Sequence, residues 1–445
     1  MSQTRGPAAA GPGSPASHRV PPALRGWAEA LGAALAGLVA MVVTAALGLW
    51  AAGAADLPAG AFPAVVAATV VAAAGGSLQA TGDAGIIVEA QAAVDAVPLS
   101  VTLAGALVTA VAFLRPLRHR AVAPAGELLG RIARTAACWL VLLWLIALAA
   151  RHSFTVTVGN ELADQLGALL GSTPTVGFRA DLPATLGFGL LWVLAVLVLA
   201  FVVSRKAPLS ARLLRFQAPV RPPAHAMLLT LLAYVGLGLL VGLVELVVRG
   251  DPARTLAVIL LGLPNVAWLA LGIGTGGAWT GHVDRSLGLP LPHALEQVLR
   301  ARGQRTLDLG SIGAYDGRVW LLVAVAAVVL LGAAFDAAVR TPVRRPARRH
   351  ALEMAVALAL TLLVVGSATR IDAHYGLSLI GVGDLGGDLG GAVTLQPQLW
   401  RLAAAGFAWG LVTGFAGGLA ARRVRRPGEV RDAPPARPPD PGRRG

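Results

Sequence analysis

Cysteine, lysine and charge in general are scarce in this chain of 445 residues. Cys138 is the single cysteine, which excludes an intrachain disulfide and a cysteine-based metal cage. Charged residues make up 13% of the chain, hydrophobic residues make up 56%, and the mean hydropathy is +0.69. Such a composition leaves too little polar surface to cover a soluble globule. It predicts a protein whose main solvent is lipid.

Signatures of enzyme chemistry are also missing from the sequence. It contains no Ser/His/Asp grouping of recognised spacing, no His-Glu-x-x-His site and no Gly-Lys-Ser/Thr phosphate loop. The run Gly381-x-Gly383-x-x-Gly386 has the letters of a dinucleotide fingerprint, but it is followed by more glycines and Pro397 instead of a helix. We therefore expect no enzyme activity, no cofactor and no metal site.

Arginine is abundant, and it lies almost entirely on one side of the apolar segments. Five basic stretches hold 26 of the 37 Lys and Arg residues, namely 5–25, 115–134, 205–221, 340–349 and 422–444. Basic connections next to membrane spans stay in the cytoplasm. The pattern predicts a multi-pass protein of the plasma membrane with both termini cytoplasmic.

The net charge of +14 would in a soluble protein suggest a nucleic-acid partner. Here the excess charge sits on the connections between spans, where each Lys or Arg near anionic headgroups is worth about 1 kcal/mol. The predicted partner is therefore the lipid bilayer, and no nucleic acid is expected. A protein partner stays unknown, and a second copy of the chain is one option.

Eight apolar stretches are long enough to be transmembrane helices. They lie near 30–50, 101–114, 132–150, 184–203, 227–248, 319–339, 351–369 and 402–421, and the second is short unless it starts at Pro98. Two further stretches, 61–74 and 256–273, each contain a proline and run into paired glycines. A full crossing by either would move later arginine connections to the other side, so both are predicted to be re-entrant or outward-lying hairpins. The predicted fold class is an all-α polytopic transmembrane helix bundle with eight crossings; ten is the competing number.

The same layout occurs twice, at a spacing of about 200 residues, which predicts two parallel repeats related by an axis along the membrane normal. Matching landmarks include Gly75-Gly76 with Gly276-Gly277. The ordinary regularity of a polytopic protein is the alternative. The predicted units are a disordered tail at 1–25, a first repeat at 26–206, a basic cytoplasmic linker at 207–225, a second repeat at 226–422 and a disordered Pro-rich tail at 423–445.

A few polar residues are candidates for a cavity or another polar site. Glu89-x-Gln91-x-x-x-Asp95 is spaced for one helical surface, Asp384 and Asp388 offer oxygen ligands for a cation, and His374 lies at the outer end of the seventh span. Solvated surface carboxylates and an interfacial anchor are the competing interpretations. The candidates are Asp83, Glu89, Asn265, His374 and Asp384.

Three other patterns concern the spans and their outer connections. Glu245 and Asp336 lie near span ends, where an ionisable side chain reaches the interface. Four glycines at 406, 410, 414 and 418 mark one face of the last span for close packing, either within the chain or in a dimer. Residues 293–318 have the pattern of an amphipathic helix on the outer leaflet.

Five runs of residues are distinctive, namely 81–91, 263–277, 373–378, 383–387 and 409–415. These runs resemble the streptophobe family of actinobacterial multi-pass membrane proteins. The resemblance covers the chain from about Trp27 to Ala421, and it implies a hydrophobic membrane protein without an established activity, substrate or catalytic residue.

Two hypotheses about function follow from these patterns. The first is passage of a small solute, ion or lipid through a polar cavity between the two repeats, where Gly75 and Gly276 would meet. The second is a non-catalytic membrane scaffold or interaction protein, which predicts closed, apolar packing throughout the bundle.

Overall fold

The computed structural model describes residues 22–57, 60–83, 88–119, 125–155, 175–204, 211–248, 250–283, 305–341, 346–379, 383–384 and 391–424. Within these ranges nine helices are long and apolar enough to cross a membrane. The chain is therefore an integral membrane protein with many apolar helices. The nine are α1 (Pro22–Ala51), α3 (Leu99–Leu114), α4 (Ala125–Ala149), α6 (Leu182–Val203), α7 (Ala211–Val248), α8 (Pro252–Gly274), α11 (Trp320–Arg340), α12 (Ala347–Ala368) and α13 (Leu399–Ala420).

All eight predicted spans are helices. The two ambiguous stretches, however, are single helices and not hairpins: α2 covers Ala61–Ala73, and α8 covers 23 residues. The predicted linker at 207–225 is also largely helical, since α7 begins at Ala211 and continues through Pro219, Pro222 and Pro223. The tails at 1–21 and 425–445 lie outside the described residues.

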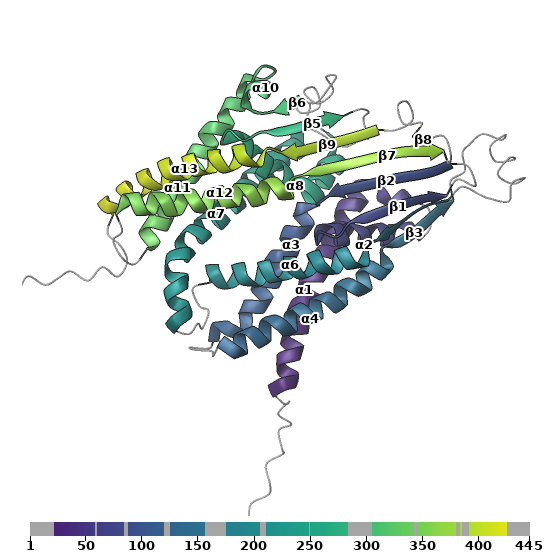
Figure 1. The fold of residues 1–445 in the computed structure, drawn as a ribbon, viewed down its shortest axis with the longest axis horizontal. Helices are drawn as coiled ribbons and strands as arrows, with labels where there is room; N and C mark the ends of the chain where they lie inside the picture. Colours follow the sequence, from purple (N-terminus) through teal and green to yellow (C-terminus); the bar gives the residue numbers. More distant parts are fainter. Residues whose placement is uncertain are drawn as a thin grey trace, which may run out of the picture.

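A nine-stranded antiparallel sheet stands at one end of the bundle, so the all-α prediction was incomplete (Figure 1). Its strand order is β3-β4-β1-β2-β7-β9-β5-β6, and β8 pairs with β7. The sheet replaces two predicted features, because the residues from Glu89 to Asp95 form a strand, and the described part of 293–318 holds β6 and the short helix α10 (Leu309–Gly313). The strands are β1 (Leu78–Asp83), β2 (Val88–Ala96), β3 (Arg151–Thr155), β4 (Thr175–Ala180), β5 (Trp279–Val283), β6 (Arg305–Leu307), β7 (Ile371–Leu379), β8 (Gly383–Asp384) and β9 (Gly391–Pro397).

Each half of the chain supplies one continuous block of this sheet. The first half runs α1, α2, β1, β2, α3, α4, β3, β4 and α6, and the second runs α7, α8, β5, β6, α11, α12, β7, β9 and α13, with α10 and β8 as additions. The blocks β3-β4-β1-β2 and β7-β9-β5-β6 meet where β2 pairs with β7 from Val88↔Leu379 to Ala96↔Ile371. This long pairing joins the two halves.

Strands and helices follow one another with almost no connecting chain. β3 begins two residues after α4 ends, and α13 begins two residues after β9 ends. Since α3, α4, α6, α11, α12 and α13 all have one end at the sheet, their other ends, at which the arginine connections begin or end, lie at the opposite end of the bundle, away from the sheet (Figure 1). α1 begins at that opposite end too, because Glu29 pairs with Arg131 of α4 at 2.8 Å.

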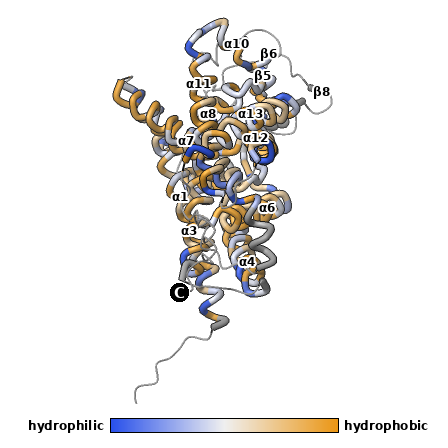
Figure 2. The backbone as a smooth tube through the Cα atoms, turned by 90° about the vertical axis from the view of Figure 1, so that its left-hand side faces the viewer, coloured by the Kyte–Doolittle hydropathy of each residue, from blue (hydrophilic) through white to orange (hydrophobic). Residues whose placement is uncertain are grey.

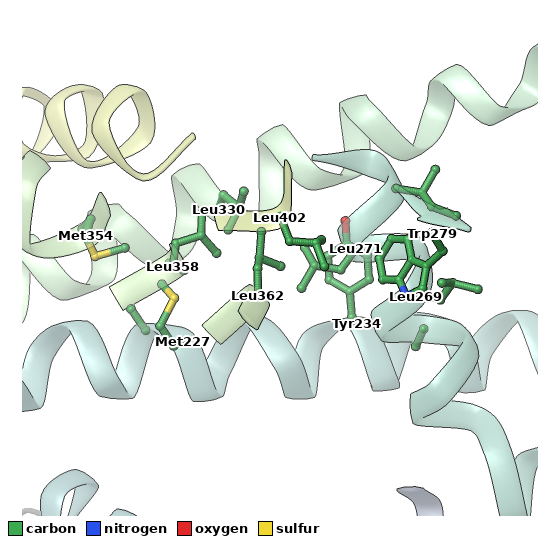
Figure 3. Packing of buried hydrophobic residues seen from close by; sticks show 14 of the residues in the cluster. Met227, Tyr234, Leu269, Leu271, Trp279, Leu330, Met354, Leu358, Leu362 and Leu402 are labelled. Carbon is green, nitrogen blue, oxygen red and sulfur yellow. The ribbon is translucent and has the colours of Figure 1, made fainter. Parts of the chain in front are cut away.

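Each half has its own apolar core. In the second half Leu271, Trp279, Leu330, Leu358 and Leu362 are fully buried and pack together (Figure 3). The first half has a matching cluster around Met41, Phe113, Trp139, Leu143 and Leu197. Many large apolar side chains are also exposed on the helices, as a lipid-facing surface requires. The helices are largely hydrophobic along their length (Figure 2).

The glycine face of α13 packs within the chain, against α12. Cβ atoms built at positions 406 and 414 would lie 2.9 and 2.8 Å from the Cα atoms of Ala359 and Ala351, so the two backbones are in direct contact. Small residues permit this close approach, and dispersion contacts then stabilise the pair in lipid. Of the two alternatives for this face, the contact inside the chain is the one observed.

Candidate functional site

The two apolar stretches that the sequence left ambiguous, α2 and α8, contact the sheet end of the bundle. For α2, the Thr102 hydroxyl of α3 donates to the carbonyl of Ala73 at 2.7 Å, and a Cβ at Gly76 would meet Thr185 of α6 at 2.7 Å. Thr102 and Thr185 both belong to the first turn of helices that start at the sheet. With 13 residues, α2 is about 20 Å long, which is less than the hydrocarbon thickness.

α8 is longer. It packs along the middle of α7, where Trp268 donates to Leu231 O at 3.1 Å, and other contacts are with the sheet ends of its neighbours. Its residue Ile259 accepts a hydrogen bond at 2.8 Å from Ser100 at the start of α3, and Gly274 lies against Leu322 at the start of α11. Leu261 meets Gly48 near the end of α1. α8 therefore reaches from one half of the molecule to the other along the side that adjoins the sheet.

Both helices end on the same paired-glycine turn. Gly75 and Gly276 have φ of 85° and 91°, in the left-handed region that a side chain disfavours. The amide of Gly76 donates to Val71 O at 2.9 Å, and the amide of Gly277 donates to Gly272 O at 2.8 Å. Each is the six-to-one hydrogen bond of a Schellman motif, which satisfies the last carbonyls of a helix.

The residue that follows each turn is held in the same way. The carbonyl of Ser77 accepts a hydrogen bond at 3.2 Å from the amide of Asp181, and the carbonyl of Ala278 accepts one at 2.9 Å from the amide of Gln398. Asp181 and Gln398 are the N-cap residues of α6 and α13, the last helices of their halves. Each turn is therefore anchored inside its own half.

The junction of the two halves is held by polar groups around Pro264 in α8. Proline has no N–H and its ring crowds the preceding turn, so helical hydrogen bonds fail nearby. Ser100 of α3 fills this gap, because its hydroxyl donates to Ile259 O at 2.8 Å and accepts from the amide of Leu263 at 3.2 Å. In an apolar environment, backbone N–H and C=O groups freed by a proline need another hydrogen-bond partner, and a neighbouring hydroxyl provides one here.

Asn265 completes this junction. Its amide nitrogen donates to Val97 O at 2.9 Å, and its amide oxygen accepts from the backbone N–H of Leu99 at 3.1 Å. The side chain thus bridges the chain on both sides of Pro98, between β2 and α3. The one predicted site residue in an apolar helix therefore binds the backbone of the other half.

The structure brings three of the other predicted residues into one row across the sheet. In the backbone register Asp83 lies opposite Glu89, Glu89 lies opposite Ser378 of β7, and Ser378 lies opposite Asp384 of β8. His374 is elsewhere on β7, opposite Ala93 and Ala392. Asp388 lies outside the described residues, and the described part of the chain holds no group of three or more metal-ligating side chains.

Among the ionisable residues near span ends, Asp336 forms an ion pair within the chain. Its carboxylate lies 2.6 Å from Arg340 Nε, one turn along α11, and 3.6 Å from His225 Nδ1 of α7. An apolar span tolerates a carboxylate that is paired in this way. The sequence singled out Asp336, but it did not indicate that His225 lies nearby.

Ser100 is the junction residue that the sequence did not reveal. One serine in an apolar run is common, and its importance depends on Pro264, which is far away in the sequence. A proline inside an apolar helix is the available signal, because a partner must satisfy the backbone groups that it frees.

Comparisons with protein-family models, curated proteins and solved structures gave no match.

Proposed function

We propose that the protein is a non-catalytic membrane scaffold that holds a continuous β-sheet at one face of the plasma membrane. The proposal depends on what the polar side chains at the junction of the two halves bind. Ser100 and Asn265 bind backbone atoms of the opposite half. A sheet joined along the whole length of β2 adds to the same rigid connection.

The topology proposed here has eight crossings, with α2 and α8 remaining on the sheet side. Their contacts with the sheet ends of α3, α6 and α11 support this number, although α8 alone is long enough to span. All arginine connections then share one compartment, the cytoplasm, and the sheet faces the outside. We also propose that the protein belongs to the streptophobe family, because the runs of residues named above resemble that family.

The two halves are proposed to be parallel repeats of one ancestral unit. Their strands have the same order and the same directions, and both short helices end on the same glycine turn anchored to the N-cap of the last helix. Repeats in which equivalent elements keep one direction are related by an axis along the membrane normal.

Passage of a small solute is the second candidate, because each half contains an apolar helix that ends on a glycine turn at the edge of the bundle. Transporters build sites from such broken helices. In this chain a Cβ at Gly276 would have no atom within 4 Å, but the atom nearest to Gly75 belongs to Phe188 of its own half, and Ala278 and Trp279 behind the second turn are fully buried. This packing favours the scaffold.

Flux through reconstituted vesicles separates the two functions. Vesicles with and without the protein are loaded with potassium and, in parallel, with a small fluorescent anion, and release is followed in the absence and presence of a membrane potential. The scaffold predicts release equal to that of empty vesicles. The passage function predicts release above that of empty vesicles. It also predicts that this release stops when Gly276→Cys, on a Cys138→Ala background, is labelled with a bulky maleimide. That result would overturn the scaffold in favour of passage.

A further inference from the structure

The two outer edges of the sheet are equivalent to the two strands that meet in its middle. β3 occupies the place in the first block that β7 occupies in the second, and β6 occupies the place that β2 occupies in the first. Among the described strands, β3 pairs only with β4 and β6 only with β5. The described part of the sheet thus ends, on each side, with a strand whose counterpart in the other half is paired at the centre.

The equivalence extends to the register of individual residues. The pair Leu78↔Ala180 of β1 and β4 corresponds to Trp279↔Pro397 of β5 and β9, because each pair lies two residues beyond the glycine turn and next to the N-cap of the last helix. This gives one fixed alignment of β1 with β5 and of β4 with β9.

The remaining strands keep the same alignment. His152 of β3 lies opposite Phe178, and Ile371 of β7 lies opposite Leu395, the residue that corresponds to Phe178. β3 therefore aligns with β7 so that His152 matches Ile371, and Thr155 matches His374.

The second edge aligns in the same manner. Gln79 of β1 lies opposite Ala93 of β2, and the equivalent residue Thr280 of β5 lies opposite Thr306 of β6. Ala93 therefore corresponds to Thr306. Since Ala93 lies opposite His374 in the central pair, the same pairing between the outer edges would place Thr306 opposite Thr155.

From this alignment we infer that copies of the protein associate head to tail, with β6 of one copy adding to β3 of the next in the register Thr306↔Thr155. A sheet edge presents unpaired N–H and C=O groups to a further strand. The inference extends the proposed scaffold function and rests on the proposed duplication of the halves.

Strand direction selects this arrangement over an association of like edges. Copies inserted in one orientation share their strand directions, because the strands continue from the membrane helices. Two β3 edges, or two β6 edges, would then meet in parallel, whereas β6 and β3 meet antiparallel, as do all pairs among the described strands. Head-to-tail contacts of this kind generate a ring when the rotation closes and an open row when it does not.

The contact between copies is smaller than the central junction. In the register Thr306↔Thr155, Thr306 and Leu307 of β6 lie opposite Thr155 and Phe154 of β3, which makes two residue pairs within the described strands, against nine pairs between β2 and β7. The helix α2, which would face the neighbouring copy, is also shorter than its counterpart α8. Confinement of both copies to one bilayer raises their effective concentration. We therefore expect the association to form in the membrane, and we expect detergent to weaken it.

Disulfide cross-linking in native membranes tests the inference. Two full-length chains with different tags, both on a Cys138→Ala background, carry Thr155→Cys or Thr306→Cys and are produced together, then oxidised before solubilisation. The expected product is a linked pair that carries both tags. Each variant produced alone should give no linked pair, because like edges do not meet.

Matched controls separate this inference from the proposed scaffold. Phe154→Cys with Thr306→Cys places the two side chains on opposite faces of the sheet, so no link is expected. Ala93→Cys with His374→Cys in one chain should form an internal link, which reports the central sheet. If the internal link forms but the mixed pair does not, self-association is overturned and the scaffold remains; if the internal link also fails, the sheet itself is wrong. Like-tag links alone would also overturn the head-to-tail arrangement.

Discussion

At the scale of single residues, the packing of α13 on α12 depends on glycines, which have no Cβ atom at the contact. A Cβ at Gly410 would overlap the backbone of Ala355, whereas Gly332 in α11 has open space at the same atom. We expect Gly410→Ala to lower the free energy of unfolding by about 1–3 kcal/mol, because one of two backbones must move. Gly332→Ala, the matched control, should raise it by up to about 1 kcal/mol through helix propensity. Thermal unfolding in detergent measures both, and equal effects would contradict this account.

Single residue types indicated some of the site residues, but they did not indicate their partners. Asn265 stands out as an amide in an apolar run, and its role became clear only from Val97 and Leu99, which are more than 160 residues away. Asp83, Glu89 and Asp384 share a row because three strand registers align them, and no local spacing predicts that. Residue type can therefore mark a polar position in a membrane protein, but its partner depends on tertiary structure.

At the scale of elements, α8 and α3 share one hydrogen-bond arrangement around Pro264 and Ser100. Ser100→Ala removes a donor and an acceptor and leaves two backbone groups of α8 unsatisfied, so we expect a loss of about 1–3 kcal/mol. In a Pro264→Ala background α8 can close its own bond from Leu263 to Ile259, and the same substitution should then cost clearly less. A double-mutant cycle in thermal stability measures this difference.

Thr69→Ala is the control for this cycle, because the Thr69 hydroxyl donates only to Val65 O of its own helix α2. Its effect is expected to be the same with and without Pro264. Strict additivity of Ser100→Ala and Pro264→Ala would mean that the hydroxyl does not replace the helical bond.

Elements also differ in how well the sequence predicts them. Every predicted span is a helix, because lipid forces an apolar segment to satisfy its backbone internally. The strands were missed because β2 and β9 are rich in alanine, glycine and polar residues, which have low strand propensity, and because their pairing is between distant segments. The short helices α2 and α8 were placed on the correct residues, but as hairpins.

At the scale of the whole molecule, the helix ends that adjoin the arginine connections lie away from the sheet. Single cysteines at Arg115 and Arg348, on a Cys138→Ala background, are expected to react with an impermeant maleimide only after the membrane is opened. Tyr315→Cys, at an exposed position on the sheet side, should react in intact cells. Labelling of Arg115→Cys and Arg348→Cys from different sides would contradict the eight-crossing topology.

The junction also predicts how the two halves behave as separate chains. Residues 1–206 and 207–445, produced together, are expected to co-purify, because the β2–β7 pairing and the bonds of Asn265 and Ser100 join them. Asn265→Leu in the second fragment should reduce the recovered first fragment several-fold, and Thr69→Ala in the first should not. Equal recovery in both cases would show that the polar contacts do not hold the halves together.

The near absence of connecting chain between strand and helix has a mechanical consequence. Because β3 follows α4, and β7 follows α12, after one or two residues, a change in the tilt of either helix must displace its strand. The strands are hydrogen-bonded one to the next across both halves, so a displacement on one side is transmitted to the strands that follow. We therefore expect the sheet to hold the two helix groups together when the bilayer is stretched or thinned.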